Sequence, residues 1–127
     1  GAAAAGALRA GAAGVMLGTA FLTCPEAGTP EAHRRAILSS GSDRTAITRA
    51  FSGRPARGIV NRYLEELAGA DLAPFPVLNS MTRGIRGAAA KAQRPEFMSL
   101  WAGQGAPLAR VMPAAELVAT LVSEMEG

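Results

Sequence analysis

The sequence predicts an α/β fold that is mostly helical and contains few strands, and two neighbouring features carry this prediction. The apolar run Val15-Met16-Leu17 leads into Gly18-Thr19 and then into a helix-compatible segment. A continuous apolar run that ends in a turn before a helix is typical of a buried parallel strand. Upstream, the Ala-rich residues 1–10 predict a helix that packs on a sheet and is closed by Gly11. The order helix, loop, strand, helix is that of an α/β repeat.

Gly18 and Thr19, at the end of the predicted strand, are candidate ligand-binding residues. Glycine lets a ligand approach the backbone closely because it has no Cβ. Thr19 can cap the following turn, or its hydroxyl and N–H can hold an anion at the start of a helix. In a (β/α)8 barrel, a cofactor phosphate commonly sits between the loops after the last two strands. These residues alone leave both an ordinary turn and a phosphate site open.

The next elements are predicted from local start and stop signals. Thr29, followed by Pro and Glu, begins a helix expected to end near Ser39. His33, the only histidine, stands beside two arginines in this helix, and we expect it on the surface rather than in a catalytic role. Residues 45–51 predict a short extended segment, and residues 52–55 a turn.

The second half of the sequence predicts mainly helices. Residues 59–68, residues 77–92 and the segment after Pro113 have helical apolar spacing, and residues 96–101 are a short helix candidate. Residues 102–107 form a Gly-rich turn without the Lys of a Walker loop. The expected buried faces are Leu78, Met81, Ile85 and Ala89 on the second long helix, and Ala114, Leu117, Val118, Leu121, Val122 and Met125 on the last.

Phe75, Asn79 and Arg83 are candidate substrate-side residues. Phe75 lies between two prolines before a helix, and Asn79 and Arg83 are four residues apart on a face other than the apolar one. They are either plain surface residues or the lining of an approach to a pocket. The sequence shows no metal-ligand spacing of His or Cys and no Ser/His/Asp or Cys/His set.

Composition argues against several classes of protein. The 127 residues suffice for one domain with a core, and the net charge is +3. The thirteen basic residues are scattered among acidic ones, unlike the basic stripe of a nucleic-acid binder. No apolar run approaches the length of a membrane span. Cys24, the only cysteine, is expected to be a small buried hydrophobic residue, and a reducing cytoplasm fits its solitary occurrence.

Several segments together resemble the FMN-dependent nitronate monooxygenases. The "AFSGRPARGI" and "WAGQG" segments look particular to that family, whereas residues 11–22 are shared with other flavin barrels, including flavin-dependent enoyl reductases. The segments are residues 11–22, residues 48–58, Asn61-Arg62, Pro74-Phe75-Pro76 and residues 97–105. The resemblance implies the C-terminal part of a (β/α)8 TIM barrel. Residues 1–40 would form the last βα unit or units of a flavin-binding barrel, and residues 41–127 a mostly helical segment packed on it.

The resemblance also implies a function, the oxidation of alkyl nitronates with O₂ at FMN. Met16, Leu17, Gly18 and Thr19 match the family's FMN segment, with Gly18 and Thr19 at the phosphate. The family's catalytic histidine belongs to an earlier strand, so no catalytic residue is expected in this chain and His33 does not inherit that role. Phe75 stands where the family leads us to expect an aromatic residue, often Tyr.

The chain is also about half of the roughly 250 residues that a complete barrel needs. It begins on Gly within a helical pattern, and we interpret it as the C-terminal part of a longer protein. A missing N-terminal barrel half, or another chain, is expected to complete the fold. The alternatives are a related enoyl reductase and a non-catalytic helical interaction domain derived from the barrel.

Overall fold

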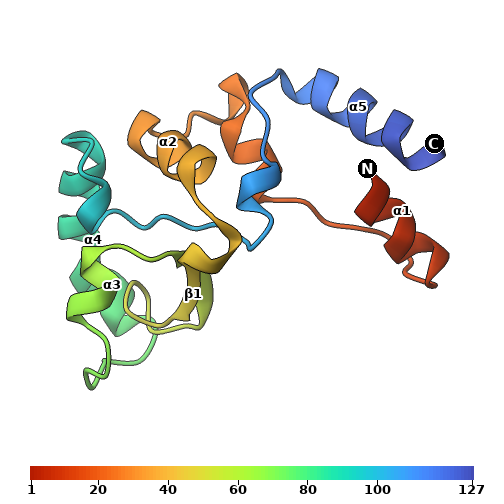
Figure 1. Ribbon diagram of the computed structural model, residues 1–127. Helices are drawn as coiled ribbons and strands as arrows, with labels where there is room; N and C mark the ends of the chain where they lie inside the picture. Colours follow the sequence, from red (N-terminus) through yellow and green to blue (C-terminus); the bar gives the residue numbers. More distant parts are fainter.

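The computed structural model describes all 127 residues and is mostly helical, with one two-stranded antiparallel sheet (Figure 1). No helix combines the length and the apolar character that crossing a bilayer would need. The helices are α1 Ala2–Arg9, α2 Glu31–Ser39, α3 Arg62–Glu66, α4 Val77–Lys91 and α5 Ala114–Glu126, and the strands are β1 Thr45–Thr48 and β2 Ala56–Ile59. Short 3₁₀ helices cover Thr19–Thr23, Pro25–Ala27, Ser42–Arg44, Pro95–Phe97 and Ala106–Leu108.

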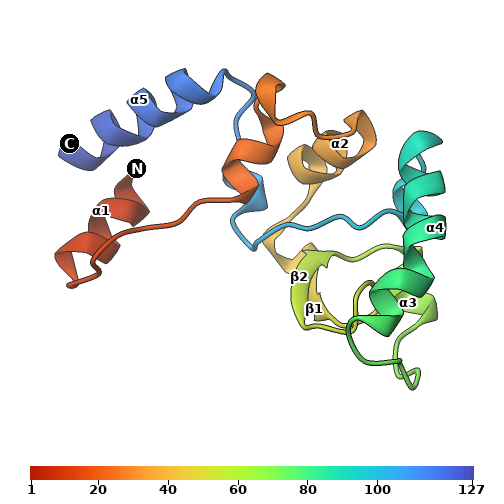
Figure 2. The same cartoon turned by 180° about the vertical axis from the view of Figure 1, so that it is seen from behind.

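The secondary-structure elements form two groups at opposite ends of the molecule, and extended segments connect them. Helices α1 and α5 lie side by side at one end, where the two termini are close together, and the hairpin, α3 and α4 form the other end (Figures 1 and 2). The Ala-rich α1 therefore packs on another helix rather than on a sheet, contrary to the sequence-based expectation. Gly11, with φ of +98°, follows α1 as predicted.

The core lies between α2, α4, β2 and the segment around Leu100. Its buried apolar residues are Ala32, Ile37, Ile59, Ala89, Met98, Leu100, Ala102 and Ala106. A second cluster centres on Phe51, whose side chain is fully buried. The Phe51 ring stacks on Tyr63 at 5.0 Å and meets Trp101 edge-on at 4.9 Å. These two contacts tie the hairpin to α3 and to the Trp101 segment.

The second strand of the hairpin ends in a residue that was predicted to be helical. Ile59 was expected to begin a helix, but it ends β2 opposite Thr45 of β1. Its N–H donates to the carbonyl of Leu100 at 2.8 Å, so tertiary pairing overrides the local helical pattern. The helix α3 begins only at Arg62. The predicted helix at residues 96–101 is likewise limited to one 3₁₀ turn, after which Trp101 pairs with β2 at Gly58.

The segment expected to form a buried strand, Val15-Met16-Leu17, is extended but unpaired. Its side chains are 43%, 97% and 42% exposed, so the prediction of a buried strand is wrong for these 127 residues by themselves. A strand needs neighbours for its backbone N–H and C=O groups. In this chain, only the hairpin and its bridge to Trp101 are paired in this way.

Helices α2, α4 and α5 occur where they were predicted, but two of the predicted faces are only partly buried. On α4, Leu78 and Ala89 are buried, whereas Met81 and Ile85 are exposed and Thr82 is buried instead. On α5, only Leu117 is buried, Ala114, Leu121 and Met125 are half-buried, and Val118 and Val122 are exposed. Apolar spacing therefore located these helices correctly but overestimated the surface that this chain covers.

Candidate functional site

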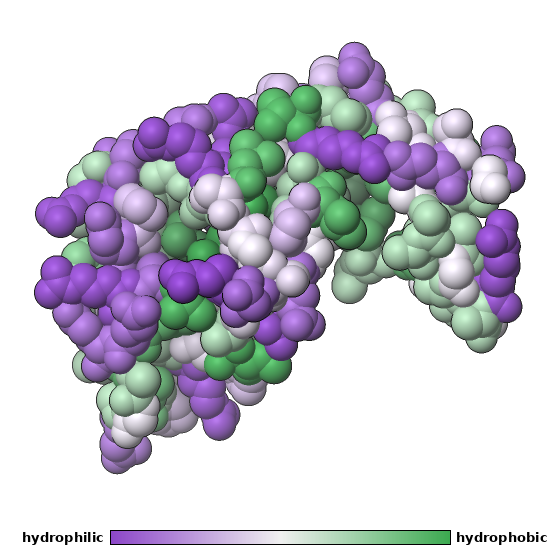
Figure 3. All heavy atoms as spheres, in the orientation of Figure 1, coloured by the Kyte–Doolittle hydropathy of each residue, from purple (hydrophilic) through white to green (hydrophobic).

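All four predicted FMN-binding residues line one cavity of about 700 Å³. The cavity lies between the segment from Met16 to Ala20, the segment from Gly103 to Arg110, and helices α1 and α5. Figure 3 shows the surface notched between the α1 end and the rest of the chain, with apolar residues along the notch. The segment predicted from sequence to hold a ligand is therefore also the wall of a cavity.

Thr19 and the Gly-rich loop meet at this cavity. The N–H of Gly103 donates to Thr19 Oγ1 at 2.9 Å. The Thr19 hydroxyl proton and the N–H groups of Gly18 and Thr19 have no acceptor within the chain. Three hydrogen-bond donors thus remain free at the end of the extended segment.

Thr23, which no signal in the sequence indicated, anchors the 3₁₀ helix Thr19–Thr23. Its buried hydroxyl donates to the carbonyl of Arg110 at 2.7 Å, which fastens the helix to the far wall of the cavity. Buried Cys24, next in the chain, is the small core residue that the sequence predicted, and burial raises the pKa of its thiol. The thiol is therefore protonated at neutral pH and is no nucleophile.

One charged pair also borders the cavity. Arg110 Nη1 lies 2.6 Å from Glu124 Oε1. The hydrogen bond from Arg110 is the main cause that lowers the pKa of Glu124 below its usual range. The charge of Arg110 is thus already balanced within the chain.

The substrate-side candidates divide between two places. Phe75 packs beneath Arg54, whose guanidinium lies 4.1 Å from the ring centroid. Arg83 lines a cavity of about 340 Å³ together with His33, and forms no ion pair. Asn79 is bound to another residue of that cavity lining, Arg86, by a 2.8 Å hydrogen bond. Asn79 does not line this cavity itself and is connected to it only through Arg86, while Phe75 lies in a separate contact.

His33 is buried, so its predicted surface position is wrong. Only 7% of the residue is exposed, and its Nε2 lies 3.1 Å from the carbonyl oxygen of Trp101. Burial lowers the pKa of the imidazole, and the hydrogen bond with Trp101 partly offsets this effect. Residues adjacent in a helix do not share a face. The exposed position expected for the neighbouring arginines therefore did not indicate whether His33 is exposed or buried.

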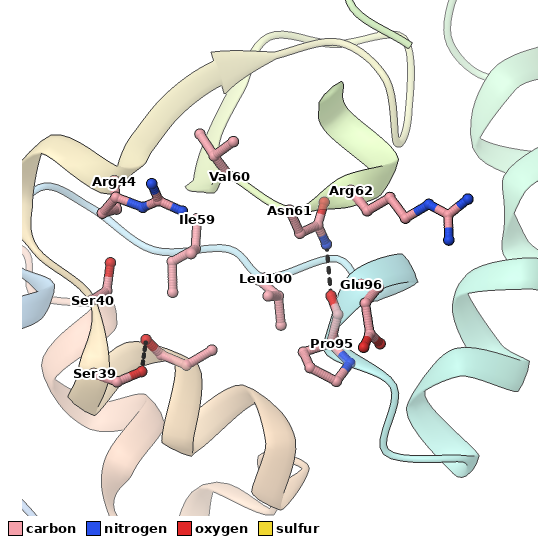
Figure 4. Close-up of a pocket in the computed structure, with 11 residues that line it drawn as sticks. Ser39, Ser40, Arg44, Ile59, Val60, Asn61, Arg62, Pro95, Glu96 and Leu100 are labelled. Carbon is pink, nitrogen blue, oxygen red and sulfur yellow. Dashed lines mark hydrogen bonds between the residues drawn. The ribbon is translucent and has the colours of Figure 1, made fainter. Parts of the chain in front are cut away.

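A third cavity, of about 320 Å³, lies between the C-terminal end of α2, the end of β2 and the 3₁₀ helix Pro95–Phe97 (Figure 4). Its most connected side chain is Asn61, which caps α3 by accepting from the N–H of Leu64. Its Nδ2 donates to the carbonyls of Pro95 at 2.8 Å and Met98 at 2.9 Å. Because these bonds use both ends of the amide, Asn61 has a structural role here.

Comparison with known proteins gives related sequences. A profile of the family described as nitronate monooxygenase matches residues 2–124. The chain is 43% identical over 124 residues to a nitronate monooxygenase of Pseudomonas aeruginosa, covering 95% of this chain and 35% of the relative. It is 40% identical over 117 residues to a probable nitronate monooxygenase of Staphylococcus aureus, covering 91% and 33%.

Solved structures agree with this relationship. The chain superposes on a nitroalkane oxidase from Streptomyces ansochromogenes with a TM-score of 0.93 and 46% identity, covering 98% of this chain and 36% of the other. FabK from Thermotoga maritima gives a TM-score of 0.78 at 23% identity, covering 96% and 40%, which is a likeness of fold alone. The chain thus spans about a third of the length of the relatives that it matches. Since the profile match extends over nearly all of the sequence, the chain belongs to the nitronate monooxygenase family.

Proposed function

We propose that this chain forms the C-terminal part of an FMN-dependent enzyme that oxidises alkyl nitronates with O₂. Residues 1–40 would supply the last βα unit of the flavin-binding barrel, and residues 41–127 the helical segment that packs on it. The remaining strands and the catalytic histidine would lie in a further part of the protein, which corresponds to the region of the relatives that this chain does not cover. The observation that carries the proposal is the set of free donors at Gly18 and Thr19, where the family resemblance assigns the FMN phosphate.

The chemistry of this donor set suits a phosphate. The oxygen of Thr19 accepts from Gly103, so its own proton is free to be donated to an anion. A Cβ on Gly18 would meet nothing within 4 Å, so the space above that residue is open to a ligand. Charge-assisted bonds from N–H and O–H groups to an anion are about twice as strong as neutral ones. Met16 and Leu17 would contact the cofactor from the adjoining segment.

Bound FMN would supply the electron transfer between the nitronate and O₂, while the chain supplies position and charge. On the substrate side, Arg83 has no acidic partner and offers a positive charge to the anionic nitronate. Asn79, one helical turn earlier, would donate hydrogen bonds, and Phe75 would form an apolar boundary.

The exposed segment Val15-Met16-Leu17 has a place in this proposal. Its extended backbone and apolar side chains are those of a strand without neighbours. We infer that it pairs with strands of the complete barrel, which would bury its side chains and orient Gly18 and Thr19 toward the cofactor.

The test uses the complete protein that carries this sequence, purified and reconstituted with FMN. The proposal expects the absorbance spectrum of bound flavin and oxygen consumption that depends on an alkyl nitronate. A colourless protein that takes up no FMN would support the non-catalytic interaction domain instead. A flavoprotein that reduces enoyl substrates with a nicotinamide cofactor and leaves nitronates unchanged would support the enoyl reductase.

A further inference from the structure

We propose that Arg86 is a positioning residue that fixes the orientation of the Asn79 side-chain amide, so that the amide presents hydrogen-bond donors to the nitronate. This inference rests on the proposed function, and in particular on the substrate-side role of Asn79. It concerns a residue that neither the sequence pattern nor the resemblance singled out.

Arg86 lies within α4 and uses each of its guanidinium nitrogens. Its Nη2 donates to the backbone oxygen of Asn79 at 3.0 Å and to Asn79 Oδ1 at 2.8 Å. Its Nε donates to Thr82 Oγ1 at 3.0 Å, and its Nη1 donates to Ser99 Oγ at 3.3 Å. Arg86 forms no ion pair within the chain, so these neutral groups are its partners.

The contact between Arg86 and Asn79 determines which end of the amide faces outward. A guanidinium can only donate hydrogen bonds, so the amide atom that faces it must be the oxygen. A flipped amide would place two donor groups against each other. Nδ2 of Asn79 is therefore the outward end, it has no partner within the chain, and the residue is half-exposed. A nitronate has two oxygen acceptors and matches a directed N–H donor.

The guanidinium itself is held in place from the core. Thr82 is buried, and its hydroxyl donates to the carbonyl of the fully buried Phe51 while accepting from Arg86. This chain of hydrogen bonds links Asn79 to the backbone of Phe51, whose side chain is fully buried. Arg86 therefore has little freedom to reorient, and the amide that it holds is preorganised.

The charge of Arg86 also favours an anion, in a cavity that Arg86 lines and Asn79 does not. Arg86 and Arg83 line the same cavity, and its lining contains no carboxylate. His33 also lines it, and since burial lowers the pKa of its imidazole, this residue is neutral at pH 7. The cavity therefore favours an anion through its two guanidinium groups.

The experiment is a double-mutant cycle on nitronate turnover in the complete flavin-loaded enzyme, with the variants Asn79→Ala, Arg86→Lys and the double variant. Losing the directed donor is expected to raise KM by about tenfold, with kcat within about twofold. Lysine keeps the charge of Arg86 but cannot make its four contacts, so Arg86→Lys is expected to raise KM to a similar extent. Because Arg86 acts through Asn79, the double variant should have nearly the KM of Asn79→Ala alone.

A matched control is Arg62→Lys, which changes the same residue type at an exposed site paired with Glu66 and should leave KM unchanged. Flavin content and melting temperature identify variants that fail to fold, and in that case Arg86→Gln replaces Arg86→Lys. The inference is overturned if Asn79→Ala leaves KM unchanged, if Arg86→Lys leaves it unchanged while Asn79→Ala raises it, or if the two effects multiply in the double variant. A wild-type enzyme without flavin or nitronate turnover would overturn the proposed function, and this inference with it.

Discussion

The N–H of Gly103 donates a hydrogen bond to Thr19 Oγ1 across 84 positions of sequence. This bond joins the extended segment near the N-terminus to the Gly-rich loop that precedes α5. It also makes the Thr19 oxygen an acceptor, which leaves the hydroxyl proton for another partner. One side chain thus links the two segments and remains available to an anion.

Replacing Thr19 by valine is expected to weaken FMN binding by the complete enzyme. Valine keeps the volume of threonine but removes the hydroxyl that we propose as a donor to the phosphate, and with it the acceptor for Gly103. We expect a rise of about tenfold or more in the dissociation constant for FMN, as for the loss of one hydrogen bond to a charged group. Fluorescence titration of the apoprotein measures this, and Thr19→Ser, which retains the hydroxyl, is the control. Equal affinity for wild type and valine variant would rule out a phosphate contact at Thr19.

The hairpin turn gives a prediction about stability. Gly53 has φ of +87°, and a Cβ there would lie 2.8 Å from the Pro74 carbonyl carbon. Gly53→Ala is expected to lower the free energy of unfolding by about 2–4 kcal/mol, through backbone strain and displacement of the segment that carries Phe75. Gly69 also has a positive φ, of +76°, but a Cβ there would meet nothing. Gly69→Ala should therefore cost only about 1–2 kcal/mol. Urea unfolding of the two variants compares the costs, and equal losses would show that the contact with Pro74 is unimportant.

His33 predicts a dependence of stability on pH. Burial lowers its pKa in the folded chain below the usual 6.5, so the unfolded chain takes up a proton at pH values where folded His33 stays neutral. Its contribution to stability is therefore complete above about pH 7 and is lost as the pH falls through its folded pKa. The measurement is urea unfolding between about pH 7 and 5, comparing wild type with His33→Gln. The stability of the wild type should fall more steeply on acidification. Parallel curves would mean that His33 has an ordinary pKa.

The 127-residue chain expressed alone is expected to bind FMN weakly or not at all. Met16 is almost fully exposed, and Val15 and Leu17 lack the strands that would fix the segment. The hydrogen-bond donors of Gly18 and Thr19 follow this unpaired segment, so binding must also order the segment, and the entropy lost lowers the affinity for FMN. Titration of flavin fluorescence tests this with the complete protein as the control. Tight stoichiometric binding by the isolated chain would contradict the expectation.

The sequence predicted those elements whose signals are local. The limits of α2, α4 and α5 follow from proline near the helix start and from apolar residues at helical spacing, which short-range interactions determine. The helix end at Gly11 and the turn at Gly53 were also predicted from local glycine signals, and both glycines have a positive φ in the structure. The family was recognised from short segments, and the profile match confirms it.

The remaining features depend on partners distant in sequence. Ile59 became a strand residue because Thr45 and Leu100 pair with it, and His33 is buried because Trp101 lies over its helix face. Thr82 rather than Met81 is buried because Phe51 offers it an acceptor. None of these partners lies within one helical turn, so no periodicity of the sequence reveals them.

The sequence predicted which residues form the candidate site but not the contacts between them. Met16, Leu17, Gly18 and Thr19 do line one cavity, but the contact of Thr19 with Gly103 needed the folded chain. The assignment of these four residues to FMN remains a proposal. Asn79, Thr82 and Arg86 have the i, i+3, i+7 spacing of one helix face, but which of these side chains bond one another needed the folded chain.

We propose that Gly18 and Thr19 hold the FMN phosphate at the end of a barrel strand. A crystal structure of the complete protein with FMN tests it most directly. We expect phosphate oxygens within hydrogen-bond distance of the Gly18 and Thr19 N–H groups and the Thr19 hydroxyl, with Val15-Met16-Leu17 paired in the sheet and buried. A phosphate bound elsewhere, or an unpaired and exposed residue 15–17 segment in that structure, would contradict it.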